Sequence, residues 1–126
     1  MVNLIKDSER GDLMAFDTID VPFYVKRIFV VNNVNPHEIR GNHSHKSCLQ
    51  LLICTNGSID LHYTDGIHNY IVKLYKGDSY LIEPLVWSKQ IYNEYKSELM
   101  VLCSHEYDKN DYITDFEDFK KLVNEN

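Results

Sequence analysis

The sequence predicts an all-β protein, a jelly roll or barrel that ends in one short helix, and three observations support this. Short runs rich in Val, Ile, Leu and Tyr recur along the chain. Turn residues separate them at intervals of about 8 to 12 residues, as in sandwiches and barrels. Only the last segment has helical periodicity. The chain has 126 residues, the size of one domain, and we expect residues 1–126 to form it.

Glycine-containing turns separate the predicted strands. Asn56-Gly57 and Asp65-Gly66 favour hairpin turns, which predicts an antiparallel meander around them. Near the C-terminus, Thr114 is the predicted N-cap of the helix, and Glu117 follows three residues later as in a capping box. The predicted strands span residues 25–31, 49–54, 58–63, 70–75, 80–82, 89–92 and 99–104.

The composition indicates an ordinary globular protein. Hydrophobic residues make up 44% of the chain and charged residues 25%. The formal net charge of −6 repels polyanions, so we expect no nucleic-acid partner. The N-terminal segment has no apolar run long enough for a signal peptide or a membrane span, and the three cysteines form no CxxC pair. We therefore expect a cytoplasmic protein with no membrane partner and with its cysteines in the core.

The segment IRGNHSHKSCLQ, residues 39–50, contains the residues best suited to chemistry. In an extended backbone side chains repeat every two residues, so His43 and His45 should point to the same face. Gly41, just before them, permits an unusual backbone conformation. An unperturbed imidazole has a pKa of about 6.5, which suits proton transfer in both directions near pH 7.

The spacing of the two histidines, Gln50 and a later glycine resembles the first cupin signature, and residues 77–87 (GDSYLIEPLVW) resemble the second. Two departures affect metal binding, because Gln50 stands where the ligand glutamate belongs and no histidine follows Pro84. A transition metal in such a site prefers three or four N and O ligands, one of them a carboxylate. We therefore expect a cupin-like double-stranded β-helix (jelly roll barrel) without metal or other cofactor, with His43 and His45 free for acid–base catalysis.

Longer blocks of the sequence resemble the dTDP-sugar 3,4-ketoisomerases, small cupins that make 3-keto sugars for later transamination. The resemblance covers nearly the whole chain, and its most distinctive parts are RGxHxHK and the later YDxxDYIxD. It implies conversion of dTDP-4-keto-6-deoxyglucose to a dTDP-3-keto-6-deoxyhexose, for 3-amino-3,6-dideoxy sugars such as those of O-antigens, and it implies a homodimer. The matching blocks are RGDL (10–13), DVPFYVKRIF (20–29), RGNHSHK (40–46), QLLICTNGSIDL (50–61), EPLVW (83–87) and EYDKNDYITDFEDF (106–119).

The resemblance and the chemistry together suggest roles for single residues. We expect His43 to be the base that acts on carbon and His45 to assist the proton transfers on oxygen, although the two roles could be exchanged. Arg40 is the candidate for stabilising the oxyanion, and Arg27 for binding phosphate. Phe29 stands where related proteins can carry a tyrosine, so the sequence leaves the acid that acts on oxygen unidentified.

Four further residues complete the expected substrate site. Trp87 could stack on a ring of the substrate, although a sole tryptophan also suits the core. Arg10 and Ser88 could influence the configuration at C4 of the product. The four residues are Gln50, Arg10, Trp87 and Ser88.

Three other functions stay open from the sequence. A metal-dependent cupin would recruit a further ligand from His37, His62, His68 or Glu83 and would need metal for activity. A sugar-binding cupin without catalysis would bind the nucleotide sugar but exchange no proton at C3. A nucleotide-sugar epimerase of related fold would instead act at C3 and C5 of its substrate.

Overall fold

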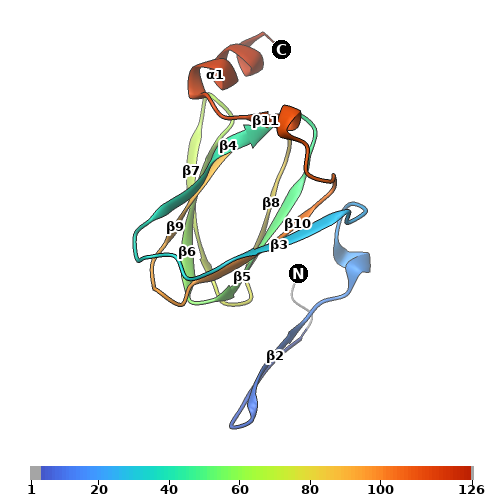
Figure 1. Cartoon of the computed structure of the whole chain (residues 1–126), viewed down its shortest axis with the longest axis vertical. Coiled ribbons are helices and arrows are strands. Elements are labelled where there is room, and N and C mark those ends of the chain that lie inside the picture. The colour runs from blue at the N-terminus through green and yellow to red at the C-terminus, as the bar shows by residue number, and fades with distance from the viewer. Residues whose placement is uncertain (1–3, 126) are drawn as a thin grey trace.

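The computed structural model describes residues 4–125 as two sheets wrapped into an open barrel, with a helix at one end and an N-terminal hairpin that projects away from the other (Figure 1). Short 3-10 turns lie at Thr18–Asp20 and Lys109–Asp111. The other elements are β1 (Leu4–Ser8), β2 (Gly11–Ala15), β3 (Arg27–Val31), β4 (Ile39–His45), β5 (Gln50–Asn56), β6 (Ser58–Thr64), β7 (Asn69–Tyr75), β8 (Ser79–Ile82), β9 (Trp87–Tyr92), β10 (Glu98–Cys103), β11 (Tyr112–Ile113) and α1 (Phe116–Asn124).

The sheet order confirms the predicted all-β barrel. The four-stranded sheet has the order β3-β10-β5-β8, and the five-stranded sheet has the order β11-β4-β9-β6-β7. Each strand predicted from the sequence is present, with ends that differ by at most two residues. The hairpin β1–β2 and the short strand β11 were not predicted, because they contain only five, five and two residues and lack a long alternating pattern.

The meander predicted around Asn56-Gly57 is wrong. β5 pairs with β10 and β8, whereas β6 pairs with β7 and β9, so the chain crosses from one sheet to the other at Gly57. Gly57 has a φ of 66°, and a Cβ there would lie 2.5 Å from Ser97 Oγ. The hairpin predicted at Asp65-Gly66 is confirmed, since β6 and β7 pair directly on either side of it.

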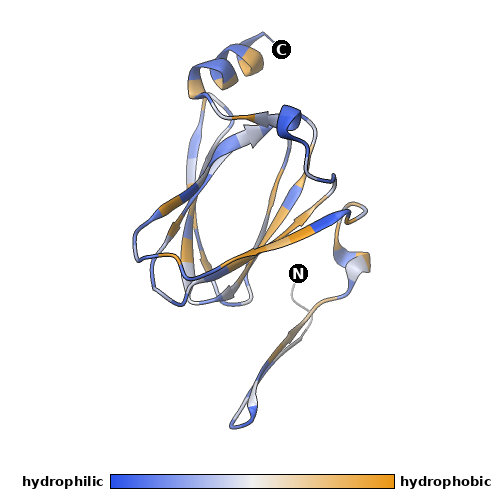
Figure 2. Cartoon of the chain, in the orientation of Figure 1, coloured by the Kyte–Doolittle hydropathy of each residue, from blue (hydrophilic) through white to orange (hydrophobic). Residues whose placement is uncertain are grey.

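β5 is apolar on both faces because both faces are covered. Leu52 and Cys54 point into the main core between the two sheets. Leu51 and Ile53 point outward, where side chains of the N-terminal segment, among them Phe16 and Phe23, pack over them. Apolar residues accordingly dominate the four-stranded sheet in Figure 2, and this burial on two sides explains the unbroken apolar run in the sequence.

Helix α1 packs against the outer face of the five-stranded sheet. Phe119 is buried there against Trp87 and Ile113. The predicted N-cap Thr114 is wrong by one residue, because the Asp115 carboxylate accepts the backbone N–H of Asp118 at 3.1 Å and caps the helix. Within residues 4–125, no helix combines the length and the apolar character that a membrane crossing requires.

Candidate active site

An irregularity in β4 orients the two histidines. Gly41 and Asn42 have φ values of 76° and 62°, and the pairing of β4 with β9 shifts register between Gly41 and His43. A Cβ at Gly41 would lie 2.7 Å from the Gln90 side-chain nitrogen, so this backbone path suits glycine. Beyond the bulge, the ring centroids of His43 and His45 are 5.0 Å apart. The prediction that the pair shares one face is therefore confirmed.

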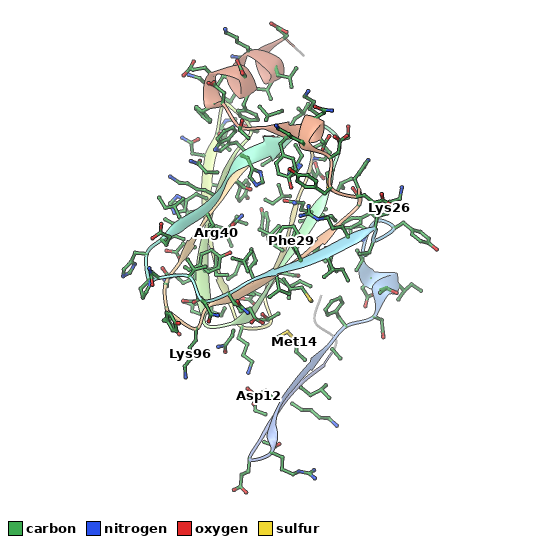
Figure 3. All side chains as sticks on the ribbon, in the orientation of Figure 1. Asp12, Met14, Lys26, Phe29, Arg40 and Lys96 are labelled. Atoms are coloured by element: carbon green, nitrogen blue, oxygen red, sulfur yellow. The ribbon has the colours of Figure 1, made fainter. Side chains whose placement is uncertain are left out.

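His43 lines a cavity of about 320 Å³ between the two sheets. Arg27 and Gln50 contribute from the four-stranded sheet, and Arg40 and Tyr112 from the five-stranded sheet. Figure 3 shows Arg40 on β4 and Phe29 on β3, two strands that face each other across the open side of the barrel. The cavity thus combines one imidazole with two guanidinium groups and an apolar wall.

His45 is held by a carboxylate. Its Nδ1 lies 3.2 Å from Asp111 Oδ2, and its side chain is buried. Asp111 in turn accepts the backbone N–H groups of Ser47 at 2.8 Å and Cys48 at 3.2 Å. An ionised carboxylate accepts the Nδ1 proton, which leaves the Nε2 lone pair of His45 available. That Nε2, like Nδ1 of His43, is buried without a hydrogen-bond partner.

The surroundings of both histidines lower the pKa of the imidazole and so favour its neutral form. Burial and, secondarily, the neighbouring His45 lower the pKa of His43 from 6.5 to about 4. Burial also lowers the pKa of His45, and the hydrogen bond that its Nδ1–H donates to Asp111 opposes that shift. At neutral pH His43 is therefore an unprotonated imidazole in a cavity, which is the state that a general base requires.

The structure brings three of the six predicted substrate-binding residues into the cavity. Arg27, Arg40 and Gln50 line it. Ser88 is buried directly across from His43 in the β4–β9 pairing, although it does not line the cavity.

Trp87 and Arg10 lie elsewhere in this chain. Trp87 is 7% exposed, packs under α1 on the outer face, and donates its Nε1–H to Asn42 Oδ1 at 2.9 Å. The core alternative for Trp87 is therefore confirmed. Arg10 is exposed at the turn of the β1–β2 hairpin, away from the cavity.

The donor groups at this site do not match a transition-metal centre. None of His37, His62, His68 and Glu83, the described residues that a metal enzyme could have recruited, lines the cavity. Another group, His45, Cys48 and Asp111, has ligand atoms within 4.8 Å of one another. Both Asp111 oxygens already accept hydrogen bonds from backbone and imidazole donors, so the carboxylate is satisfied without a metal ion.

Two residues of this site were not singled out from the sequence. Asp111 and Tyr112 are adjacent in the DYI block, and β11 pairs Tyr112 with His45. The Tyr112 ring centroid lies 4.3 Å from that of His45 and 5.1 Å from that of His43. The block was noted for its resemblance, but the pairing of a two-residue strand with β4 leaves no periodic signal.

A larger hollow lies on the outer face of the five-stranded sheet. Its volume is about 590 Å³, and its lining includes His62, Lys89 and Phe116. It contains neither member of the histidine pair, whereas the smaller cavity combines His43 with both arginines. Because chemistry depends on converging groups rather than on volume, the smaller cavity is the candidate active site.

The fold and the site define a double-stranded β-helix enzyme of the cupin class. The sequence matches the family described as WxcM-like, C-terminal (FdtA) over residues 1–124. It is 34% identical over 124 residues to the TDP-4-oxo-6-deoxy-α-D-glucose-3,4-oxoisomerase of Aneurinibacillus thermoaerophilus, covering 90% of this chain and 84% of that one. The chain belongs to this family of sugar 3,4-ketoisomerases, and it is an isomerase.

Solved structures of 3,4-ketoisomerases are similar in fold to this chain. A 3,4-ketoisomerase from Helicobacter canadensis is 32% identical with a TM-score of 0.85, covering 95% of this chain and 92% of that one. A histidine-to-asparagine variant of the 3,4-ketoisomerase QdtA from Thermoanaerobacterium thermosaccharolyticum, in complex with TDP-4-keto-6-deoxyglucose, is 30% identical with a TM-score of 0.87. That match covers 97% of this chain and 90% of the other.

Proposed function

We propose that this protein converts dTDP-4-keto-6-deoxyglucose to a dTDP-3-keto-6-deoxyhexose by histidine acid–base catalysis without a metal. The observation that carries the proposal is His43, an unprotonated imidazole that lines a cavity together with Arg27 and Arg40. The QdtA variant similar to this chain holds a substrate of this kind, which supports the same substrate class here.

The reaction moves a carbonyl from C4 to C3 and needs protons to move on carbon and on oxygen. We assign the carbon transfers to His43, which removes the proton from C3 and returns a proton to C4 of the enediol. Burial and the neighbouring His45 disfavour the imidazolium, which favours its donation of a proton to carbon. We assign His45 an assisting role in the oxygen transfers, with Asp111 fixing the orientation of its ring.

The two arginines offset the charge of the substrate. The chain has a formal net charge of −6, whereas a nucleoside diphosphate adds about two negative charges of its own. Arg27 and Arg40 lie on opposite walls of the cavity and offer planar sets of donors for phosphate and enolate oxygens. We therefore assign diphosphate binding to Arg27 and stabilisation of the oxyanion to Arg40.

The decisive experiment follows the sugar by NMR in D2O with metal-stripped protein and dTDP-4-keto-6-deoxyglucose. We expect a 3-keto product that carries deuterium at the exchanging carbon, and loss of this reaction in His43→Asn, with a general base contributing roughly 10²–10⁴-fold. His37→Asn, at an exposed histidine outside the cavity, is the matched control. Turnover that returns only with added metal would replace the proposal with a metal-dependent cupin, and binding without exchange would replace it with a binding protein.

We also propose that the protein is a homodimer. β3 is an edge strand, and its outward residues Ile28 and Val30 are 59% and 51% exposed. An uncovered apolar edge favours pairing with a second copy of the chain. Light scattering should give the mass of two chains, and Ile28→Glu should shift it toward one. A wild-type mass of one chain at micromolar concentration would contradict the dimer.

The biological setting follows from the same resemblance. We propose that the 3-keto product serves the biosynthesis of 3-amino-3,6-dideoxy sugars, in which an aminotransferase would consume the new ketone. We propose the cytoplasm as the compartment, because the three cysteines are all free thiols. A coupled assay with a 3-ketosugar aminotransferase and glutamate should yield the amino sugar only when this isomerase is present.

A further inference from the structure

The proposed reaction also needs a group that gives a proton to one substrate oxygen and takes a proton from the other. Phe29 lines the cavity but has no acidic proton. His45 is 5% exposed, does not line the cavity, and has its Nδ1 engaged by Asp111. A general acid must come within hydrogen-bond reach of the oxygen that it protonates. A different side chain must therefore meet the substrate oxygen.

We propose that Tyr112 is this catalytic residue, an inference that rests on the proposed ketoisomerase function. Among the described residues that line the cavity, Tyr112 has the one hydroxyl side chain. Its ring contacts both imidazoles, at centroid distances of 5.1 Å to His43 and 4.3 Å to His45. The phenol therefore lies beside the carbon base, where the oxygens on C3 and C4 must come.

Arg27 prepares the phenol for this role. Its Nη1–H donates to the Tyr112 hydroxyl oxygen at 3.3 Å. The guanidinium also lies over the rings of Phe29 and Tyr107, at 4.7 Å and 5.2 Å from their centroids, which fixes its position. This hydrogen bond fixes the direction of the phenol oxygen inside the cavity. Arg27 is in this respect a positioning residue for Tyr112.

The proton balance closes with one phenol and one imidazole. As His43 takes the proton from C3, the Tyr112 hydroxyl gives its proton to the oxygen on C4, and a neutral enediol forms. The Tyr112 phenolate then takes the proton from the oxygen on C3 while the His43 imidazolium protonates C4. Both residues return to their starting states, and no oxidant, reductant or metal takes part. His45, in contact with the Tyr112 ring, assists by holding the phenol in place.

Tyr112→Phe tests the assignment because it keeps the ring contacts and removes only the hydroxyl. We expect kcat to fall by roughly 10²–10³-fold, within the range for a general acid, while TDP binding measured by calorimetry changes by less than about threefold. Tyr95→Phe is the matched control, since it removes an exposed tyrosine hydroxyl outside the cavity. The control should keep wild-type kcat.

A fluorinated tyrosine at position 112 separates proton donation from a purely structural role. Fluorination makes the phenol more acidic, so the decrease of kcat at alkaline pH should begin at lower pH than in the wild type. The expected shift equals the difference in acidity between fluorinated and ordinary tyrosine, and folding and TDP binding should be unchanged. An unshifted decrease, or a Tyr112→Phe enzyme within about threefold of wild-type kcat, would overturn the assignment. An inactive wild-type protein would instead refute the proposed function itself, so the two failures are distinguishable.

Discussion

The lowered pKa of His43 predicts a specific loss of stability in mild acid. The unfolded chain binds a proton near pH 6.5, whereas the folded chain binds it only near pH 4. Between these two values the unfolded state holds more protons, so the free energy of unfolding must decrease as pH falls. Each pH unit corresponds to ~1.4 kcal/mol. Because the side chain is partly exposed, we expect His43 to account for a loss of about 2 kcal/mol across this window.

Urea unfolding at several pH values between 6.5 and 4 measures this loss, with protein concentration held fixed because a dimer would make stability concentration-dependent. His43→Asn should remove about 2 kcal/mol of the pH-dependent decrease. His37→Asn is the control, because His37 is exposed and its φ of 68° is one that asparagine tolerates. Parallel stability curves for wild type and His43→Asn would refute the burial argument.

Three further predictions concern the carboxylate beside His45, a cysteine of the main core and the packing of the C-terminal helix. Asp111→Asn should lower kcat and cost roughly 1–3 kcal/mol in the free energy of unfolding, because His45 Nδ1 and two backbone N–H groups lose an anionic acceptor; kinetics and urea unfolding test it. Burial raises the pKa of the Cys54 thiol to about 11, so a thiol reagent at pH 8 should label it only after unfolding, and labelling of native protein would contradict this. Phe119→Ala should destabilise the protein by about 3–5 kcal/mol, and the more exposed Phe116→Ala by clearly less, as thermal unfolding would show.

Local patterns in the sequence identified the strands and the histidine pair, because these depend on neighbours along the chain. The two-residue repeat of an extended backbone placed His43 and His45 on one face, and the ring distance of 5.0 Å confirms it. Gly41 was expected to allow an unusual backbone, and its φ of 76° forms part of the bulge that precedes the pair. The class of enzyme followed from the resemblance of blocks along nearly the whole chain, among them RGNHSHK (40–46).

Contacts between distant segments could be read only from the tertiary structure. Asn56-Gly57 resembles a hairpin turn locally, but the pairing of β5 with β10 and β8 makes it a crossing between sheets. Trp87 could have faced the substrate or the core, and the packing of α1 on the outer face decided for the core. Such outcomes depend on which strand becomes a neighbour, and no local propensity encodes that choice.

Some residues of the candidate active site could be predicted from the sequence, whereas others could be identified only from the tertiary structure. The sequence by itself determined the all-β class, the position of the histidine pair and the absence of the usual cupin carboxylate at position 50. Only the fold brought Asp111 and Tyr112 to the histidines, across a sequence separation of 66 residues for the Asp111–His45 hydrogen bond. A strand of two residues is too short for a periodic pattern that would predict its pairing partner. Tyr112, which we assign to the proton transfers on oxygen, could therefore be identified only from the pairing of β11 with β4.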